Sequence, residues 1–348
     1  MKNMYTAHTD SMINPVMILS RMKNNSYKKQ QYIRFSSILL LSLSLFACSE
    51  NEQNKVSDDK VVTVQTSKIV ESDQVDRVAE QDHAINDQHM NGWPTYGGQS
   101  SGTQYSGLDQ VNLDNVQQLE VAWTFHSGET SDGSDGVDPT IYEMTPIFAN
   151  NTLYSCTPFN HIVALDPGTG TQRWRFDPKK PVSGTYSHAN YCRGVSYWQS
   201  ESDEEREQIC GRRVFEGAGD GSLIAVDADT GKLCSDFGAS GQIDLNKLDY
   251  KGEGSIALTS PPAIYKDVVI VGGTILDNKW KDTPDGIIRG FDTRTGKELW
   301  NWNPIPEHLS DQVGGANVWA QMSVDLERGW VFLPTGSPSY DVYGANRK

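Results

Sequence analysis

A pair of neighbouring side chains with oxygen ligands, Asp277 and Asn278, follows an apolar run at residues 268–273. Carboxylate and amide oxygens are the hard ligands that Ca²⁺ and Mg²⁺ prefer, so this pair could hold such a cation. The same residue types are common in plain turns. The residues alone leave both interpretations open, a divalent metal site and an ordinary loop.

The second candidate for a functional site is a pair of oppositely charged residues, Arg193 and Glu143. The planar guanidinium of an arginine can grip a carboxylate through two parallel hydrogen bonds, which suits Arg193 to binding an anionic ligand. The alternative is that Arg193 and Glu143 form a structural ion pair. Their spacing in the sequence does not decide between these roles.

The elements that must position these residues are indicated by an internal repeat. An Asp-x-x-Thr-Gly turn follows an apolar run at Asp166, Asp227 and Asp292. The spacing of roughly sixty residues leaves room for four short strands in each unit. Glycine supplies the positive φ and aspartate closes the turn, so each copy predicts a β-hairpin. A tryptophan follows the first and third turns, Trp174 and Trp300, where neighbouring blades of a propeller could pack.

This repeat resembles the tryptophan-docking motif of the quinoprotein alcohol and sugar dehydrogenases, eight-bladed β-propellers that carry pyrroloquinoline quinone (PQQ). The second copy departs from the motif, with Cys234 and Phe237 in place of the tryptophan. The resemblance runs from about Trp93 to the last residue. It includes the stretches at residues 91–98, 153–157, 192–195, 236–238, 243–245, 259–262 and 334–339. Their order is most similar to the membrane glucose, quinate and shikimate dehydrogenase branch.

The resemblance implies an all-β fold, an eight-bladed quinoprotein-type β-propeller of which residues 91–348 supply about the first four blades. Relatives continue into a second half, and the catalytic aspartate of the family would follow Lys348. We therefore expect the fragment itself to be inactive. The uncovered blade faces and edges would make it prone to aggregation.

The resemblance also implies roles for the candidate site residues. Glu143 and Arg193 match positions that line PQQ, and Trp319 matches the indole that stacks beneath the quinone ring. Asp277 and Asn278 match the ligands of the Ca²⁺ or Mg²⁺ ion, which acts as a Lewis acid against the quinone. The alternative for Trp319 is a core or docking role, since the chain contains 9 tryptophans.

Two histidines depart from the family pattern. His188 lies four residues before Cys192, whereas the relatives place a cofactor-binding histidine three before, so His188 is either a cofactor contact or an ordinary loop histidine. His126 stands where glucose-type relatives usually have arginine. One cofactor or substrate contact of the family is therefore replaced here.

The N-terminal region predicts export. Basic residues precede an apolar run at 35–47, which is shorter than the roughly 20 residues that cross a bilayer, so residues 1–48 are interpreted as a signal peptide, with Met22 a possible true start. Residues 45–48 resemble a bacterial lipobox that would make Cys48 the acylated N-terminus. The alternative is an ordinary secretory signal. Residues 49–90 are polar and are expected to form a disordered tether.

These features predict a protein on the periplasmic face of a bacterial membrane, lipid-anchored at Cys48, with Ser49 favouring the outer membrane. Four cysteines remain after Cys48, an even number in an oxidising compartment, so disulfides are expected. Cys210 and Cys234 flank one predicted hairpin and are the favoured pair. No Cys-x-x-Cys-His motif occurs in the chain, which argues against a fused c-type haem in this segment.

Composition narrows the function further. A net charge of −15 argues against a nucleic-acid partner, and 31 glycines and 15 prolines favour a turn-rich fold. The predicted function is PQQ-dependent oxidation of an aldose sugar or cyclic polyol, with electrons passing to ubiquinone or a cytochrome. Two alternatives remain, a non-enzymatic lipoprotein propeller of the outer-membrane assembly type and an inactive remnant.

Overall fold

In the computed structural model the described residues are 16–22, 92–180, 190–248, 251–276, 279–280 and 282–341. The chain divides into two units, one formed by residues 1–22 and 90–348 and the other by residues 23–89. The second unit lies outside the described residues, and so do Cys48, the lipobox and the predicted tether.

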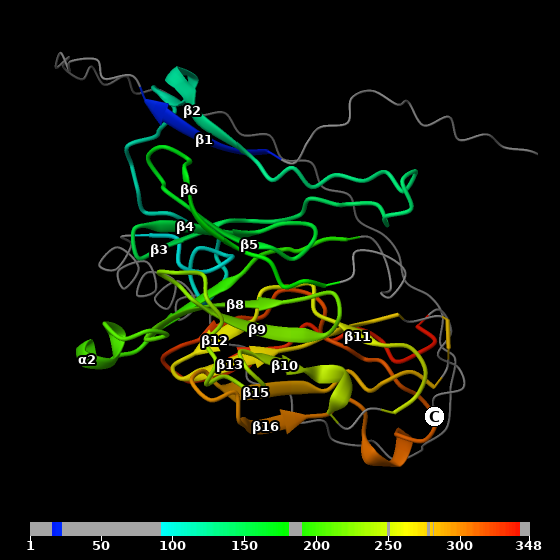
Figure 1. The fold of residues 1–348 in the computed structure, drawn as a ribbon. Coiled ribbons are helices and arrows are strands. Elements are labelled where there is room, and N and C mark those ends of the chain that lie inside the picture. The colour runs from blue at the N-terminus through cyan, green and yellow to red at the C-terminus, as the bar shows by residue number, and fades with distance from the viewer. Residues whose placement is uncertain are drawn as a thin grey trace, which may run out of the picture. The chain divides into compact units, whose positions relative to one another are not determined.

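Three four-stranded antiparallel sheets form most of this unit (Figure 1). The first contains β3 (Ile147–Ala149), β4 (Thr152–Cys156), β5 (Ile162–Leu165) and β6 (Gln172–Phe176). The second contains β7 (Ser196–Gln199), β8 (Arg212–Gly217), β9 (Ser222–Asp227) and β10 (Gln242–Asp244). The third contains β12 (Ala263–Tyr265), β13 (Val268–Val271), β15 (Ile288–Asp292) and β16 (Glu298–Trp302).

Three two-stranded sheets accompany them. They are β1 (Val16–Met22) with β2 (Leu119–His126), β11 (Ile256–Ala257) with β14 (Thr274–Ile275), and β17 (Ser323–Asp325) with β18 (Trp330–Phe332). Helix is limited to α2 (Asp203–Arg206) and the 3₁₀ turns η1 (Val116–Gln118), η2 (Leu245–Lys247) and η3 (Glu307–Leu309) in the described part. None of these helices is long and apolar enough to span a bilayer.

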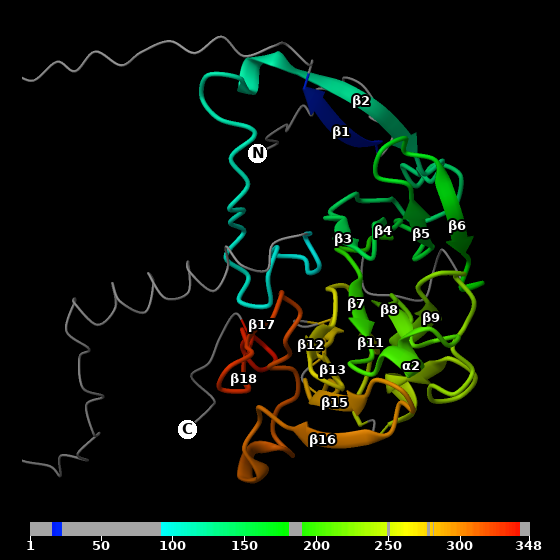
Figure 2. The same ribbon diagram turned by 90° about the vertical axis from the view of Figure 1, so that its left-hand side faces the viewer.

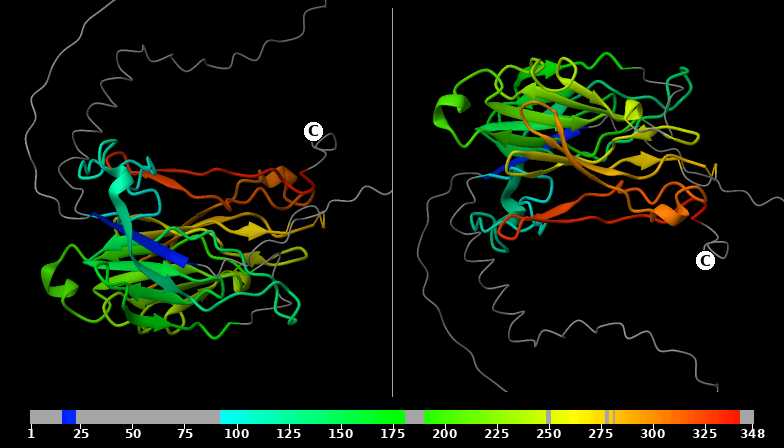
Figure 3. Two further views of the ribbon diagram at one scale, coloured as in Figure 1. Left: turned by 90° about the horizontal axis from the view of Figure 1, so that it is seen from above. Right: turned by 90° about the horizontal axis from the view of Figure 1, so that it is seen from below.

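Successive sheets pack face to face in chain order (Figures 2 and 3). One apolar cluster joins the first sheet to the second, another joins the second to the third, and a further one joins the third to β17 and β18. A middle strand is therefore covered on both faces, so all four residues of β5 and all six of β9 are buried. Burial on both faces explains why these strands are apolar runs rather than alternating ones.

The repeated turns have the predicted chemistry. The Oδ1 atom of Asp227 accepts hydrogen bonds from the backbone N–H and the hydroxyl of Thr230, at 2.8 and 2.6 Å, and Asp166 and Asp292 bond their own turns in the same way. Gly231 closes its turn with a φ of 71°. The aspartate side chains thus hold each turn in shape without tertiary help. The predicted hairpin forms at the first and third turns, as β5 with β6 and β15 with β16. After the second turn only an isolated bridge between Val226 and Leu233 forms, and β10 pairs with β9 instead.

The indole of Trp174 docks as the repeat predicts, whereas that of Trp300 lies against Gly290 of its own sheet. Trp174 of the first sheet lies over Gly231 of the second, so close that a Cβ added to the glycine would lie 2.5 Å from the ring. Its Nε1–H donates to the carbonyl of Ala228 at 3.0 Å. Trp123 of β2 lies over Gly170 of the first sheet in the same manner. Strand β2 therefore packs on the first sheet in the way that β6, the outer strand of the first sheet, packs on the second.

The second sheet, which lacks the tryptophan, packs on the third differently. Phe237 and Cys234 are fully buried between the two sheets, and the amide of Gly238 donates to the carbonyl of Thr295 in the next turn, at 2.9 Å. A backbone hydrogen bond and a buried phenyl ring thus replace the indole contact. Together these features establish an all-β, partial β-propeller with three complete blades in the described part of the chain.

Two disulfides add covalent links. Cys210 is bonded to Cys234 within the second sheet, the pair that the sequence favours, and Cys156 of β4 is bonded to Cys192 just before β7. The second link ties the first sheet to the segment that leads into the second. It also places a covalent anchor directly beside Arg193.

Candidate functional site

The candidate site lies where the first strands of successive sheets begin. Strand β3 contacts β7, β7 contacts β12, and β12 contacts β17. The segments leading into these four strands carry Glu143, Arg193, Thr259 and Trp319 in turn. Because the four first strands adjoin, residues far apart in sequence come together at one end of the strands.

Hydrogen bonds join these four segments. The amide of Thr145 donates to the carbonyl of Arg193, and the amide of Arg193 donates to the carbonyl of Thr259, both at 3.0 Å. The hydroxyl of Ser260 then donates to the carbonyl of Trp319 at 2.6 Å. The distances between the candidate side chains are set by this series of bonds rather than by the loops separately.

Arg193 is the centre of the cluster. Its Nε lies 3.0 Å from Oε2 of Glu143, and its Nη1 donates to the hydroxyl of Thr259 at 2.8 Å. That hydroxyl also bonds Oγ1 of Thr274 in β14, at 2.9 Å. The guanidinium carbon lies 5.4 Å from the ring centroid of Trp319. Three of the predicted site residues are thus together, and Glu143 and Arg193 form the ion pair that was the alternative to a role in ligand binding.

Trp319 is half exposed, with 48% of the residue accessible to solvent. An indole fixed at its backbone and open on its face can stack with a planar ligand. The Nη2 group of Arg193 has no hydrogen-bond partner among the described residues, so N–H groups remain for an anion. The arrangement can bind a flat, negatively charged molecule.

Three predicted residues cannot be placed. His188, Asp277 and Asn278 lie outside the described residues, so neither the histidine contact nor the metal pair is tested by the geometry. His126 is described, and it is exposed at the end of β2.

Thr259, Ser260 and Tyr191 also belong to the cluster, although no role was predicted for them from the sequence. The Tyr191 ring centroid is 4.9 Å from the guanidinium carbon of Arg193. Thr259 and Ser260 belong to a stretch that carried the family resemblance, which was an available signal. Tyr191 had none beyond its place two residues before Arg193.

The loop that follows β2 is held by a buried acid. Glu129 is 4% exposed, and its Oε1 lies 2.7 Å from Nδ1 of His161 and also pairs with Arg175. Burial alone would raise the pKa of Glu129, but hydrogen bonds from His161, Thr157 and the amide of Phe159 outweigh it and lower the pKa. The charged carboxylate therefore fixes this loop against the first sheet.

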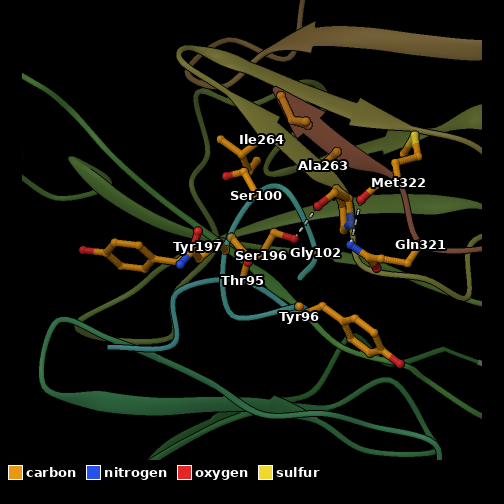
Figure 4. A pocket seen from close by; sticks show the side chains of 14 residues that line it. Thr95, Tyr96, Ser100, Gly102, Ser196, Tyr197, Ala263, Ile264, Gln321 and Met322 are labelled. Atoms are coloured by element: carbon orange, nitrogen blue, oxygen red, sulfur yellow. Dashed lines mark hydrogen bonds between the residues drawn. The ribbon is translucent and has the colours of Figure 1, made fainter. Parts of the chain in front are cut away.

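A small cavity adjoins the same strands (Figure 4). Its volume is about 30 Å³, and it lies between the loop at residues 95–102 and strands β7, β12 and β17. The loop is bound at both ends, because Trp93 exchanges two backbone hydrogen bonds with Phe148 and the amide of Val324 donates to the carbonyl of Ser100. The loop thereby connects the first blade to β17.

Face-to-face sheets with adjoining first strands define a β-propeller, and the candidate site lies at the ends of those strands. Residues 93–348 match the family of the PQQ-dependent glucose/ethanol/alcohol dehydrogenase beta-propeller domain. The chain belongs to this family.

Curated relatives support the assignment. Quinoprotein glucose dehydrogenase A of Acinetobacter calcoaceticus is 36% identical over 274 residues, 73% of this chain and 34% of the relative. The quinate/shikimate dehydrogenase (quinone) of Acinetobacter baylyi is 36% identical over 282 residues, again 73% of this chain and 34% of the relative. The chain spans about a third of the length of these relatives.

Solved structures agree on the fold. The quinohemoprotein alcohol dehydrogenase from Comamonas testosteroni matches with a TM-score of 0.56 and 24% identity, over 74% of this chain and 37% of that one. A europium-containing methanol dehydrogenase also matches with a TM-score of 0.56 and 19% identity. The match covers 74% of this chain and 45% of that one. At these identities the likeness concerns the fold alone.

Proposed function

We propose that this chain forms part of a PQQ-dependent dehydrogenase that oxidises an aldose sugar or a cyclic polyol, of the glucose-dehydrogenase type. The observation that carries the proposal is the convergence of Glu143, Arg193 and Trp319 at the ends of the first strands. An open indole face and a guanidinium with free N–H groups fit a planar molecule that bears carboxylates. The names of the relatives, which include glucose, quinate and glycerol dehydrogenases, support the substrate class.

In this proposal the residues have separate tasks. Arg193 binds a carboxylate of PQQ, Glu143 orients the guanidinium, and Trp319 supports one face of the ring. Asp277 and Asn278 hold the Ca²⁺ or Mg²⁺ ion, because they supply adjacent oxygen ligands. When bound, the quinone with its cation supplies the hydride acceptor for the carbon that carries the substrate hydroxyl. Electrons then leave to ubiquinone or a cytochrome.

The test is a titration of the chain with PQQ in the presence of Ca²⁺ or Mg²⁺. Quenching of tryptophan fluorescence measures the binding. Arg193→Ala should weaken PQQ binding at least tenfold, because charge-assisted hydrogen bonds are lost. Arg328→Ala, on the turn between β17 and β18, is the matched control and should leave the affinity unchanged. Asp277→Ala should remove most of the dependence on the divalent ion.

Dye reduction with glucose, quinate and glycerol, in the protein that carries this segment, would then identify the substrate. Absence of PQQ binding by the wild-type protein under all these conditions would contradict the proposal. It would favour the other candidate, a lipoprotein propeller without enzymatic activity.

We also propose that the protein is anchored by lipid at Cys48 on the periplasmic face of a bacterial membrane, with the outer membrane favoured by Ser49. The support is the apolar run at residues 35–47 followed by the lipobox-like residues 45–48.

A further inference from the structure

The guanidinium of Arg193 is held in its own plane by two partners. Glu143 lies 3.0 Å from Nε, and the Thr259 hydroxyl accepts from Nη1 at 2.8 Å. The Thr259 hydroxyl is in turn bonded to Thr274, and both threonines are buried. These bonds leave the Nη2 edge of the guanidinium for a ligand. They do not prevent the guanidinium plane from tilting.

Two aromatic rings contact the group from outside that network. The guanidinium carbon lies 4.9 Å from the ring centroid of Tyr191 and 5.4 Å from that of Trp319. Both distances are within the roughly 6 Å over which a cation is attracted to an aromatic face. The ring that lies closer is that of Tyr191.

The backbone beside Tyr191 is unusually well fixed. On one side, the amide of Asn190 donates to the carbonyl of Pro139 at 2.8 Å, and the carbonyl of Asn190 accepts from the amide of Ile141 at 2.9 Å. On the other side, Cys192 is buried and disulfide-bonded to Cys156. A ring carried by such a segment can act as a fixed support for a neighbouring group.

The two rings do not have interchangeable tasks. If Trp319 supports the cofactor, its exposed face is occupied by the ligand, whereas Tyr191 is partly buried and remains beside the guanidinium. We infer that Tyr191 is a positioning residue, whose ring holds the Arg193 guanidinium in the orientation that binds a carboxylate of a planar ligand. This inference rests on the proposed PQQ site.

The first test compares Tyr191→Met with Tyr191→Phe and Tyr191→Trp by the dissociation constant for PQQ. Methionine keeps an apolar side chain but has no aromatic face, so we expect affinity to fall about fivefold to twentyfold. Phenylalanine and tryptophan retain the face, and binding should remain within about twofold of the wild type. Equal affinity for Tyr191→Met and the wild type, at equal melting temperature, would overturn the inference.

A second measurement needs no cofactor and separates this inference from the proposed function. Phenylglyoxal modifies arginines, and mass spectrometry gives the rate at Arg193, with Arg328 as the internal control. Tyr191→Met should raise the Arg193 rate several-fold and leave the Arg328 rate unchanged, while Tyr191→Phe behaves as the wild type. If the wild type failed to bind PQQ, the proposed function would be refuted. The role of Tyr191 would be refuted only if Tyr191→Met left the reactivity of Arg193 unchanged.

The fold of the variants is controlled in the same samples. If Tyr191→Met melted at a lower temperature, Tyr191→Phe and Tyr191→Trp would decide the question, because both fill the site. A loss of PQQ affinity or a raised Arg193 reactivity in these two folded variants would show that the phenol group, not the ring face, matters, and would overturn the inference.

Discussion

At the scale of single residues, the most unusual side chain is Glu216 on β8, which has no exposed surface. Its Oε1 accepts from Nδ2 of Asn160 at 3.3 Å, and its Oε2 has no partner among the described residues. Burial raises the pKa of Glu216 well above its usual value, and the nearby charges of Glu129 and Asp220 raise it further. The carboxyl is therefore held neutral where an exposed glutamate would be ionised.

This predicts a pH dependence of stability. Above about pH 4.5 the unfolded chain releases the proton of Glu216 and the folded chain keeps it, so unfolding becomes easier as pH rises, by about 1.4 kcal/mol per pH unit until the folded pKa is reached. Glu216→Gln, which cannot ionise, should remove this decline and be more stable than the wild type at pH 7. Urea unfolding between pH 5 and 8 gives the free energy of unfolding of both proteins. If the two free energies changed with pH in parallel, the prediction would be contradicted.

The candidate site shows which residue roles could be predicted from sequence. Glu143, Arg193 and Trp319 were predicted because their motifs resemble those of a known family, and the structure brings the three together. The contact of Tyr191 with Arg193 could not be predicted, because it depends on how a fixed backbone turns two side chains toward each other. Thr259 reaches Arg193 only through the packing of the second sheet on the third.

At the scale of elements, local chemistry explains most of what the sequence predicted. The Asp-x-x-Thr-Gly turn closes with its own side chains, so the three turns could be recognised without any tertiary information, although only the first and third lead into the predicted hairpins. The contact of Trp174 with the next sheet was predicted from the repeat, whereas that of Trp123 was not. The interface of the second and third sheets could not be predicted, because the link from Gly238 to Thr295 joins two turns through their backbones alone.

The docking of Trp174 on Gly231 allows a direct test. Gly231→Ala places a methyl group 2.5 Å from the indole at a φ of 71°, so both backbone strain and overpacking oppose it. We expect a loss of about 2–5 kcal/mol in the free energy of unfolding. Gly128→Ala is the matched control, since its φ is 77° and no atom lies within 4 Å, and it should cost about 1–2 kcal/mol. Equal losses in chemical denaturation would show that the indole contact adds nothing.

At the scale of the whole molecule, β18 exposes a large apolar surface. Trp330 and Phe332 are 59% and 54% exposed on this strand. Among the described residues β18 pairs with β17 alone, and a strand with an open edge and apolar side chains is a site of edge-to-edge association.

We therefore expect the 348-residue chain to self-associate with increasing concentration, and sedimentation velocity measures this. Trp330→Lys with Phe332→Lys should shift the chain toward the monomer, because charges on an edge oppose pairing. Leu113→Lys is the control, since Leu113 is 93% exposed but stands alone in a loop. A wild-type chain that stays monomeric at high concentration would contradict the expectation.

Anchoring is also a property of the whole molecule. Cleavage before Cys48 and acylation should retain the protein in the membrane fraction of a Gram-negative host, and Cys48→Ser should release it or leave the precursor uncleaved. Mass spectrometry of the N-terminus with fractionation tests this. A soluble wild-type protein with an unmodified N-terminus would show that the lipobox is not used.

The series of hydrogen bonds from Thr145 through Arg193 to Thr259 has a consequence for how such a protein can change over generations. The side chain of Arg193 bonds Glu143 before the first sheet and Thr259 before the third, so a substitution there changes both the cluster and the contacts between blades. The turns and the docked indole of Trp174 lie elsewhere in the repeat and are left in place by such a change.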